Sequence, residues 1–287
     1  MRSYSWIPVV ALLAATALSA DVTGQFTTDK RPPIKPKYAA AFETRDQRDA
    51  RKRAIEVVLS EEPVDMAAAI GALDPHTILI NQKGLQDHNY ILLWVRPGND
   101  VSMNATYAAT MTQFADFTGG RFNADIKTLT ADTVAGHVWM SSGAKTMSGD
   151  TYSIDVTFST PITHGPAATK LTVGGGEPGK ALQLLLGAMS KKSWADIKGG
   201  VSELALQSLT TSDHTDQENL DEALSTLNIW LSKKPGKITG GELRGDTAIL
   251  EMEGQIFEGQ KALYLVKMVK SGPRWVFEAA TPAGMID

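Results

Sequence analysis

Two stretches of the chain alternate between apolar and polar side chains with a period of two residues. The first is VSMNATYAATM (residues 101–111), and the second is TYSIDVTF (residues 151–158). Such alternation is typical of a β-strand with one face on a core and the other in water. Strand-like runs also occur at TILI (77–80) and NYILLWVRPG (89–98), and turn sequences separate the runs. The pattern predicts an antiparallel β domain, arranged as a sandwich, over residues 74–172.

Two helices are predicted before this β domain. Thr44 and Gln47 match a capping box, in which each side chain bonds the backbone amide of the other residue. The helix that starts there becomes apolar toward its end, and Pro63 ends it and opens a second short helix. The apolar residues on one face of the first helix are Ala54, Ile55, Val58 and Leu59. Those of the second are Met66, Ile70 and Leu73. Helices and strands together define a first domain over residues 43–172.

The C-terminal part of the chain has helices first and strands afterwards. Leu182, Leu185, Leu186 and Met189 recur at helical spacing, and Thr215 with Glu218 forms a second capping box. Four strand-like segments follow, which are KITGGEL, TAILEMEGQ, KALYLVKMV and RWVFEAA. This order predicts an α+β domain over residues 180–287, and the glycine-rich residues 173–179 are interpreted as a flexible junction. The whole chain is therefore assigned to the α+β class.

The strand segments share a set of residues with a known superfamily. A Gly-Asp-x-Ala start is followed by a Leu-Val-Lys strand and a final Trp-x-Phe strand. The matching residues are Gly245, Asp246 and Ala248, then Leu265, Val266 and Lys267, then Trp275 and Phe277. Roughly residues 176 to 287 thus resemble the nuclear transport factor two-like (cystatin-like α+β cone) superfamily, in particular secreted bacterial members without an assigned function. The resemblance implies a helix-backed curved antiparallel sheet that forms a cone. It implies no active site, because that superfamily contains isomerases, dehydratases and epoxide hydrolases beside non-catalytic binding modules.

Residues 1–20, MRSYSWIPVVALLAATALSA, have the layout of a Sec-type signal peptide. Their apolar run is shorter than the about 20 residues of a membrane span. Cleavage is expected after Ser19 or after Ala20, and an uncleaved membrane anchor is the alternative. The chain contains no cysteine, so a lipoprotein is not expected. We therefore expect a bacterial periplasmic or secreted protein with no transmembrane segment after signal removal, and a flexible Pro/Lys linker over residues 21–42.

Several classes of partner are disfavoured by the sequence. The formal net charge of −4 argues against a nucleic-acid surface. Gly174, Gly179 and Lys180 match part of a phosphate-binding loop, but Ala181 stands where that loop needs Ser or Thr, so no nucleotide is expected. No two histidines have the spacing of a zinc motif, and the histidines are interpreted as surface residues. No Gly-x-Ser-x-Gly sequence occurs either, so no metal, cofactor or catalytic residue is predicted.

The candidate binding residues lie in the C-terminal domain. If the cone holds an apolar pocket, Trp194, Trp230 and Tyr264 are expected to line it, and Glu253 is expected to supply a carboxylate. Core packing of the aromatic residues and a solvated position of Glu253 are the alternatives. The first hypothesis for function is a non-catalytic periplasmic binding or envelope-interaction protein whose partner is an envelope protein. The second is an enzyme or a carrier of a small apolar ligand in the cone.

Overall fold

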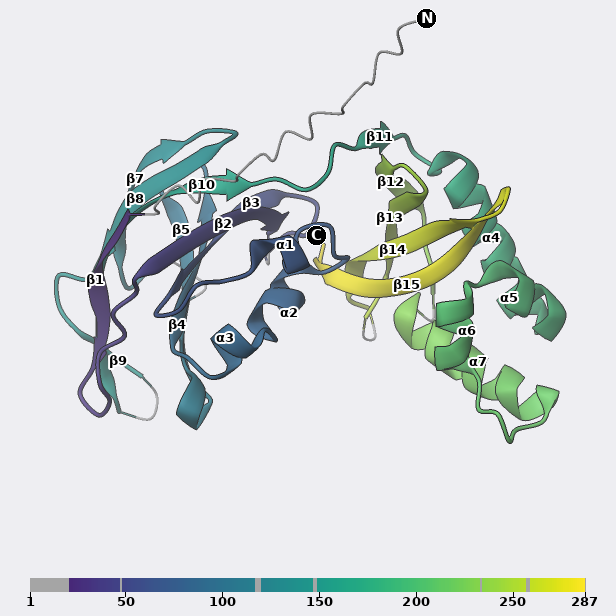
Figure 1. The fold of residues 1–287 in the computed structure, drawn as a ribbon, viewed down its shortest axis with the longest axis horizontal. Coiled ribbons are helices and arrows are strands. Elements are labelled where there is room, and N and C mark those ends of the chain that lie inside the picture. The colour runs from purple at the N-terminus through teal and green to yellow at the C-terminus, as the bar shows by residue number, and fades with distance from the viewer. Residues whose placement is uncertain are drawn as a thin grey trace, which may run out of the picture.

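The computed structural model describes residues 21–46, 48–116, 120–146, 149–232, 234–256 and 259–286. The signal peptide predicted for residues 1–20 lies outside them. The described chain forms two parts, each with its own sheet and its own apolar core (Figure 1). Helices and strands both contribute, so the predicted α+β class is confirmed.

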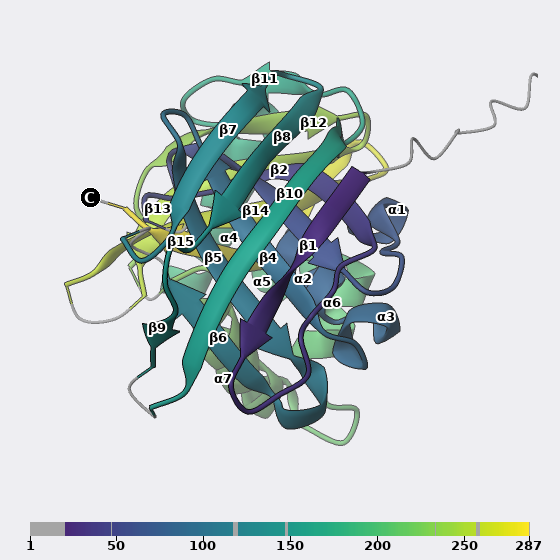
Figure 2. The same ribbon diagram turned by 90° about the vertical axis from the view of Figure 1, so that its left-hand side faces the viewer.

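Ten strands of the described residues belong to one curled sheet of mixed direction in the first part. They are β1 (Asp21–Thr28), β2 (Tyr38–Arg45), β3 (Arg53–Ser60), β4 (Tyr90–Arg96), β5 (Asp100–Tyr107), β6 (Thr112–Asp116), β7 (Asn123–Leu129), β8 (Thr133–Trp139), β9 (Ala144–Lys145) and β10 (Thr151–Thr163). Their order is β6-β5-β4-β3-β2-β10-β8-β7, and β1 and β9 also pair with β10. The end of β10 runs parallel to β2, whereas β1 and β8 pair antiparallel with the rest of that strand. Figure 2 shows the resulting layer of β7, β8, β10 and β1 in front of β2, β4 and β5.

The two layers of the curled sheet face each other across one apolar core. The predicted alternation of exposure is confirmed in β10, where the even-numbered residues from Tyr152 to Phe158 are buried. In β5 the expected core residues Val101 and Met103 are buried, but Ser102 and Thr106 of the expected solvent face are buried as well, so the prediction of a water-exposed face is wrong there. Alternation stops after β5, where the 3₁₀ helix Ala108–Thr110 begins. Met111 then adopts a left-handed backbone with φ of 49° and is exposed, so it is not a strand residue.

Two predictions for the start of the first part are wrong. Residues 21–42 are not a flexible linker, because β1 pairs along β10 and because Phe26 and Ile34 are fully buried. Those two residues also exchange backbone hydrogen bonds of 2.9 and 2.8 Å. Residues 44–60 are not a helix either, since they contain the end of β2, a turn and β3. The strand β3 is buried on both faces, and such a strand gives a nearly continuous apolar run that also fits a helical period.

Three short helices pack on the outer face of β2, β3 and β4. They are α1 (Met66–Ala69), α2 (Pro75–Ile80) and α3 (Lys83–Gln86). The short helix predicted after Pro63 is present in part as α1, which ends at Ala69 and so does not reach Leu73. The strand predicted for residues 77–80 is wrong, because these residues belong to α2. Asp74 caps that helix by accepting a 3.1 Å hydrogen bond from the Thr77 amide, and Pro75 occupies its first turn.

The second part is a five-stranded antiparallel sheet with helices on one face (Figure 1). Its strands, in spatial order, are β11 (Thr169–Leu171), β12 (Ile238–Arg244), β13 (Thr247–Gln255), β14 (Lys261–Ser271) and β15 (Arg274–Met285). Its helices are α4 (Gly176–Lys191), α5 (Trp194–Gly200), α6 (Glu203–Leu209) and α7 (Asp216–Trp230). The predicted helices and strands of this part are present, and Thr215 and Glu218 form the predicted capping box at the start of α7.

The glycine cluster lies inside the second part and is tightly packed. The strand β11 precedes the cluster and already pairs with β12, so the chain crosses between the parts before residue 169. Gly174, Gly175 and Gly176 have φ values of 88°, 68° and 60°, which disfavour any other residue. A Cβ on Gly179 would lie 1.8 Å from the Gly174 carbonyl oxygen. Residues 173–179 therefore form a fixed turn into α4, and the prediction of a flexible junction is wrong.

Apolar side chains fill the space between the second sheet and its helices. Leu250, Met252 and Val266 of the sheet are fully buried, and they belong to one cluster with Leu182 of α4 and Leu227 of α7. The resemblance to a cone-shaped fold predicts an apolar pocket in this space between the sheet and the helices. In the described residues, the side chains of the protein itself occupy it.

Candidate functional site

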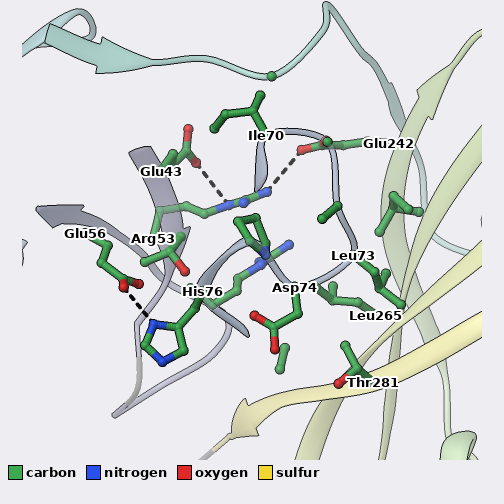
Figure 3. A pocket seen from close by; sticks show the side chains of 18 of the residues that line it. Glu43, Arg53, Glu56, Ile70, Leu73, Asp74, His76, Glu242, Leu265 and Thr281 are labelled. Atoms are coloured by element: carbon green, nitrogen blue, oxygen red, sulfur yellow. Dashed lines mark hydrogen bonds and ion pairs between the residues drawn. The ribbon is translucent and has the colours of Figure 1, made fainter. Parts of the chain in front are cut away.

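A cavity of about 270 Å³ lies between the two parts of the molecule (Figure 3). We call it the interdomain pocket. One wall comes from β2, β3, β4, residues 163–165 at the end of β10 and the segment before α2, and the other comes from β12 to β15. The acidic and basic side chains of the first wall are Glu43, Arg45, Arg53, Glu56, Asp74, His76 and His164. Those of the second wall are Glu242, Arg244 and Glu251.

The hairpin between β2 and β3 holds the two walls together through arginine side chains. Arg45 forms an ion pair with Glu251 of β13 and donates a 3.3 Å hydrogen bond to the Ala50 carbonyl. Arg51 donates a 2.9 Å hydrogen bond to Glu253 of the same strand. Hydrogen bonds between arginine and a carboxylate are assisted by charge and are stronger than neutral ones. Both glutamates therefore bind the first part of the chain on the face of β13 that points away from the helices.

An apolar contact supports these ion pairs. The Ala50 amide donates a 3.0 Å hydrogen bond to the Met285 carbonyl at the end of β15. The Ala50 side chain is fully buried in a small cluster with Leu263 and Ile286. The hairpin thus contacts the second sheet through its backbone, its apolar side chains and its charges, and this contact fixes one end of the pocket.

Glu242 of β12 binds two arginines at once. It accepts hydrogen bonds of 3.1 Å from Arg53 and 2.7 Å from Arg244. Arg53 also pairs through its Nε atom with Glu43 at 3.2 Å. Burial raises the pKa of Glu242, but the hydrogen bond from Arg244 and the charges of Arg244, Arg53 and Arg45 outweigh burial and lower it. Glu242 is therefore ionised at neutral pH and orients both guanidinium groups along the wall.

A carboxylate–imidazole pair forms the deepest polar contact of the first wall. Glu56 projects from the outer face of β3 and is fully buried. Its Oε1 atom lies 2.6 Å from Nδ1 of His76, which the capped helix α2 brings over the sheet (Figure 3). The imidazole lies beside the Trp94 indole, with ring centroids 5.9 Å apart. The second carboxylate oxygen of Glu56 is buried and has no hydrogen-bond partner among the described residues.

The surroundings of His76 favour its charged form. Burial lowers the pKa of His76, but the hydrogen bond and the charge of Glu56, with a further contribution from Asp74, outweigh burial and raise it. A group whose folded pKa is raised contributes stability that is complete below its unfolded pKa and is lost as the pH rises through its folded pKa. Because Nδ1 faces Glu56, the Nε2 atom of His76 is the ring nitrogen that can bind another group.

The three aromatic candidates lie elsewhere, on the helix side of the second sheet. Trp194 and Trp230 pack against its apolar core, and Tyr264 belongs to that core. The Trp230 and Phe277 rings are 6.1 Å apart, and the Tyr264 hydroxyl donates a 3.0 Å hydrogen bond to the Gln255 carbonyl. None of the three lines the interdomain pocket. Their positions correspond to core packing, the alternative interpretation of these residues.

The fourth candidate, Glu253, points to the other side of the sheet and binds Arg51 beside the pocket without lining it.

Sequence reasoning does not identify Glu56 and His76 as site residues. Interpreting every histidine as a surface residue is wrong for His76, whose side chain is 29 % exposed. The available signal was Glu56 itself. It interrupts the apolar run AIEVVLS, and an acidic residue in a buried strand requires a partner.

Comparisons with known proteins give no identification: no protein family, curated protein or solved structure matches this chain. Within the described ranges, no three histidine or carboxylate side chains gather closely enough to hold a metal ion. The helices in that part of the chain are all too short or too polar to span a bilayer. The molecule is thus an α+β protein with a curled mixed sheet, a second antiparallel sheet backed by helices, and a charged pocket between them.

Proposed function

We propose that this chain is an exported, non-catalytic binding protein that holds a small polar ligand in the interdomain pocket. The observation that carries the proposal is the buried Glu56 carboxylate, which faces His76 with one oxygen and has no partner for the other in the part of the chain that the structure describes. An unpaired buried acceptor costs about 1–3 kcal/mol, and each such atom in a folded protein calls for an explanation. In this proposal a polar ligand at this wall supplies the missing hydrogen bond after a small movement of the side chains that cover the buried oxygen.

The position of the pocket supports the same proposal. Binding sites for small molecules occur preferentially where two domains meet, and they combine apolar surface with a few convergent polar groups. The pocket has this composition, since Ile70, Leu73 and Leu265 lie around the same cavity as Arg53 and His76 (Figure 3). The earlier alternative, an apolar ligand inside the second part, has less support because the core there is filled.

The cellular setting is part of the proposal. A signal peptide over residues 1–20 directs the chain to the periplasm or the medium, where the pocket meets envelope components. We also propose that the second part has the nuclear transport factor two-like fold. The order of four helices followed by an antiparallel meander supports this, as does the hairpin tip at Gly245 and Asp246. In this view the binding site lies on the outer face of that sheet, where β2 and β3 dock.

The test is native mass spectrometry of the protein purified from the periplasm without denaturation. The wild-type chain should carry a bound small molecule. Ala72→Trp, at a half-buried position in the pocket wall, should lose it, and Ala68→Trp, at an exposed position of α1 outside the pocket, should retain it. Equal retention by both variants would place any ligand elsewhere, and a wild-type protein that repeatedly carries nothing would count against the proposal.

A further inference from the structure

We infer that the ligand of the interdomain pocket is an uncharged, hydroxyl-rich molecule of about the size of one sugar ring. This inference rests on the proposed function and adds the chemical class of the ligand. Its basis is that each cation of the pocket already pairs with a carboxylate, while hydrogen-bonding atoms of both kinds remain.

The first step concerns the charges. Arg53 lies between Glu43 and Glu242 at 3.2 and 3.1 Å, and Arg244 lies 2.7 Å from Glu242. The remaining close pairs are Arg45 with Glu251 and His76 with Glu56. An anionic ligand would have to displace the carboxylate of such a pair and leave it without a counter-charge, which is strongly unfavourable for partly buried groups. A cationic ligand would meet, among the described lining residues, only Asp74 as a carboxylate outside these ion pairs, and the guanidinium groups of the pairs would repel it. An uncharged ligand binds without breaking any pair.

The second step concerns the unused hydrogen-bonding groups. A guanidinium carries five N–H donors, and Arg53 directs only Nε and Nη2 to its carboxylate partners. Donors therefore remain on Arg53. The Nε2 atom of His76 donates when the ring is protonated and accepts when the ring is neutral. The second oxygen of Glu56 is buried behind this wall, so Asp74 supplies the acceptors that a ligand reaches directly. A carboxylate or phosphate only accepts and an ammonium only donates, whereas a hydroxyl does both, so neighbouring hydroxyls match this mixture best.

The third step concerns size and shape. A volume of about 270 Å³ lies at the lower end of the range for ligand pockets, and it admits one ring but not a peptide or a nucleotide. Ile70, Leu73 and Leu265 give the cavity apolar surface next to Arg53 and Glu242 (Figure 3). A sugar ring has the complementary construction, with C–H groups on its faces and hydroxyls along its edge. Asp74 adds acceptors, because each of its oxygens accepts one hydrogen bond from Thr77 and has a second lone pair.

The experiment compares three probes that share one ring and differ in charge: glucose, glucuronate and glucosamine. Binding to the full chain at neutral pH is followed by saturation-transfer NMR and calorimetry. Glucose should bind at least about tenfold more tightly than either charged probe. Its binding should be lost in Ala72→Trp and in Thr281→Trp, which fill the cavity from opposite walls, and retained in Ala68→Trp. Circular dichroism of each variant establishes that it is folded.

Each other outcome overturns a defined part of the account. Glucuronate or glucosamine binding as tightly as glucose, with the same loss in Ala72→Trp, overturns the ligand class and leaves the pocket as the binding site. A bound non-sugar ligand in native mass spectrometry, together with no binding of the three probes, also overturns the ligand class and leaves the pocket as the binding site. No binding of any probe together with no bound ligand overturns both the inference and the proposed function.

Discussion

The ion pair between Arg45 and Glu251 gives a quantitative test of the contact that forms the pocket. The two side chains are 12 and 25 % exposed, so the pair lies between the surface and the buried case. At an effective dielectric constant of about 20, two unit charges about 4 Å apart attract by about 4 kcal/mol, and desolvation of both groups offsets much of this attraction. We expect a net coupling energy of about 1–2 kcal/mol, which exceeds the about 0.2–1 kcal/mol of exposed pairs.

The assay is a double-mutant cycle of Arg45→Met and Glu251→Gln, measured by urea unfolding. Arg45→Met alone should lower the free energy of unfolding by about 2–3 kcal/mol, which is more than the coupling energy of the pair. The reason is that this variant leaves Glu251 without its cation and the Ala50 carbonyl without this donor. The control is the exposed pair of Glu177 and Lys180 at the start of α4, for which a much smaller coupling is expected. A coupling of Arg45 and Glu251 no larger than that of the control pair would refute the reasoning.

Three further predictions concern stability. Gly179→Ala should destabilise the chain by more than about 2 kcal/mol, because its methyl group would lie 1.8 Å from the Gly174 oxygen. Gly187→Ala adds a methyl group that, in the described structure, meets no atom beyond its own helix within 4 Å, so it should stabilise the chain by about 0.5–1 kcal/mol. Thermal unfolding that ranks the two variants otherwise contradicts this reasoning. Thr215→Ala removes the cap of α7 and should cost about 1 kcal/mol in urea unfolding, and unchanged stability would argue against the cap. Glu242→Gln should destabilise the chain at neutral pH. The deficit should shrink below the unfolded pKa of about 4.3 and vanish as the pH falls through the lowered folded pKa, and a deficit that persists at low pH would contradict this.

The sequence predicts the second part of the fold well and the start of the first part poorly, and the reason is local. In the second part each element has one buried face, and caps such as Thr215 and Glu218 mark where helices begin. In the first part β3 is buried on both faces, so its apolar run lacks a two-residue period and also fits a helix. Residues 77–80 show the opposite error, because their short apolar run predicts a strand but belongs to a helix. The signals for that helix are Asp74 at the N-cap and Pro75 in the first turn.

The candidate site was beyond the reach of sequence patterns for a different reason. Arg45 and Glu251 lie 206 positions apart, and only the docking of two separate sheets brings them together. Glu56 and His76 are closer in sequence, but their contact depends on α2 lying over β3, and β3 itself was predicted as a helix. Once a strand is assigned there, the single acidic residue in its apolar run becomes the natural place to search for a partner.

The measurement that tests the central claim most directly is a crystal structure of the protein purified from its native source without denaturation. The account predicts electron density for one small molecule between the two walls of the interdomain pocket, within hydrogen-bond distance of Arg53 or His76. Density for a ligand on another surface, or a pocket that holds only water in repeated preparations, would contradict it.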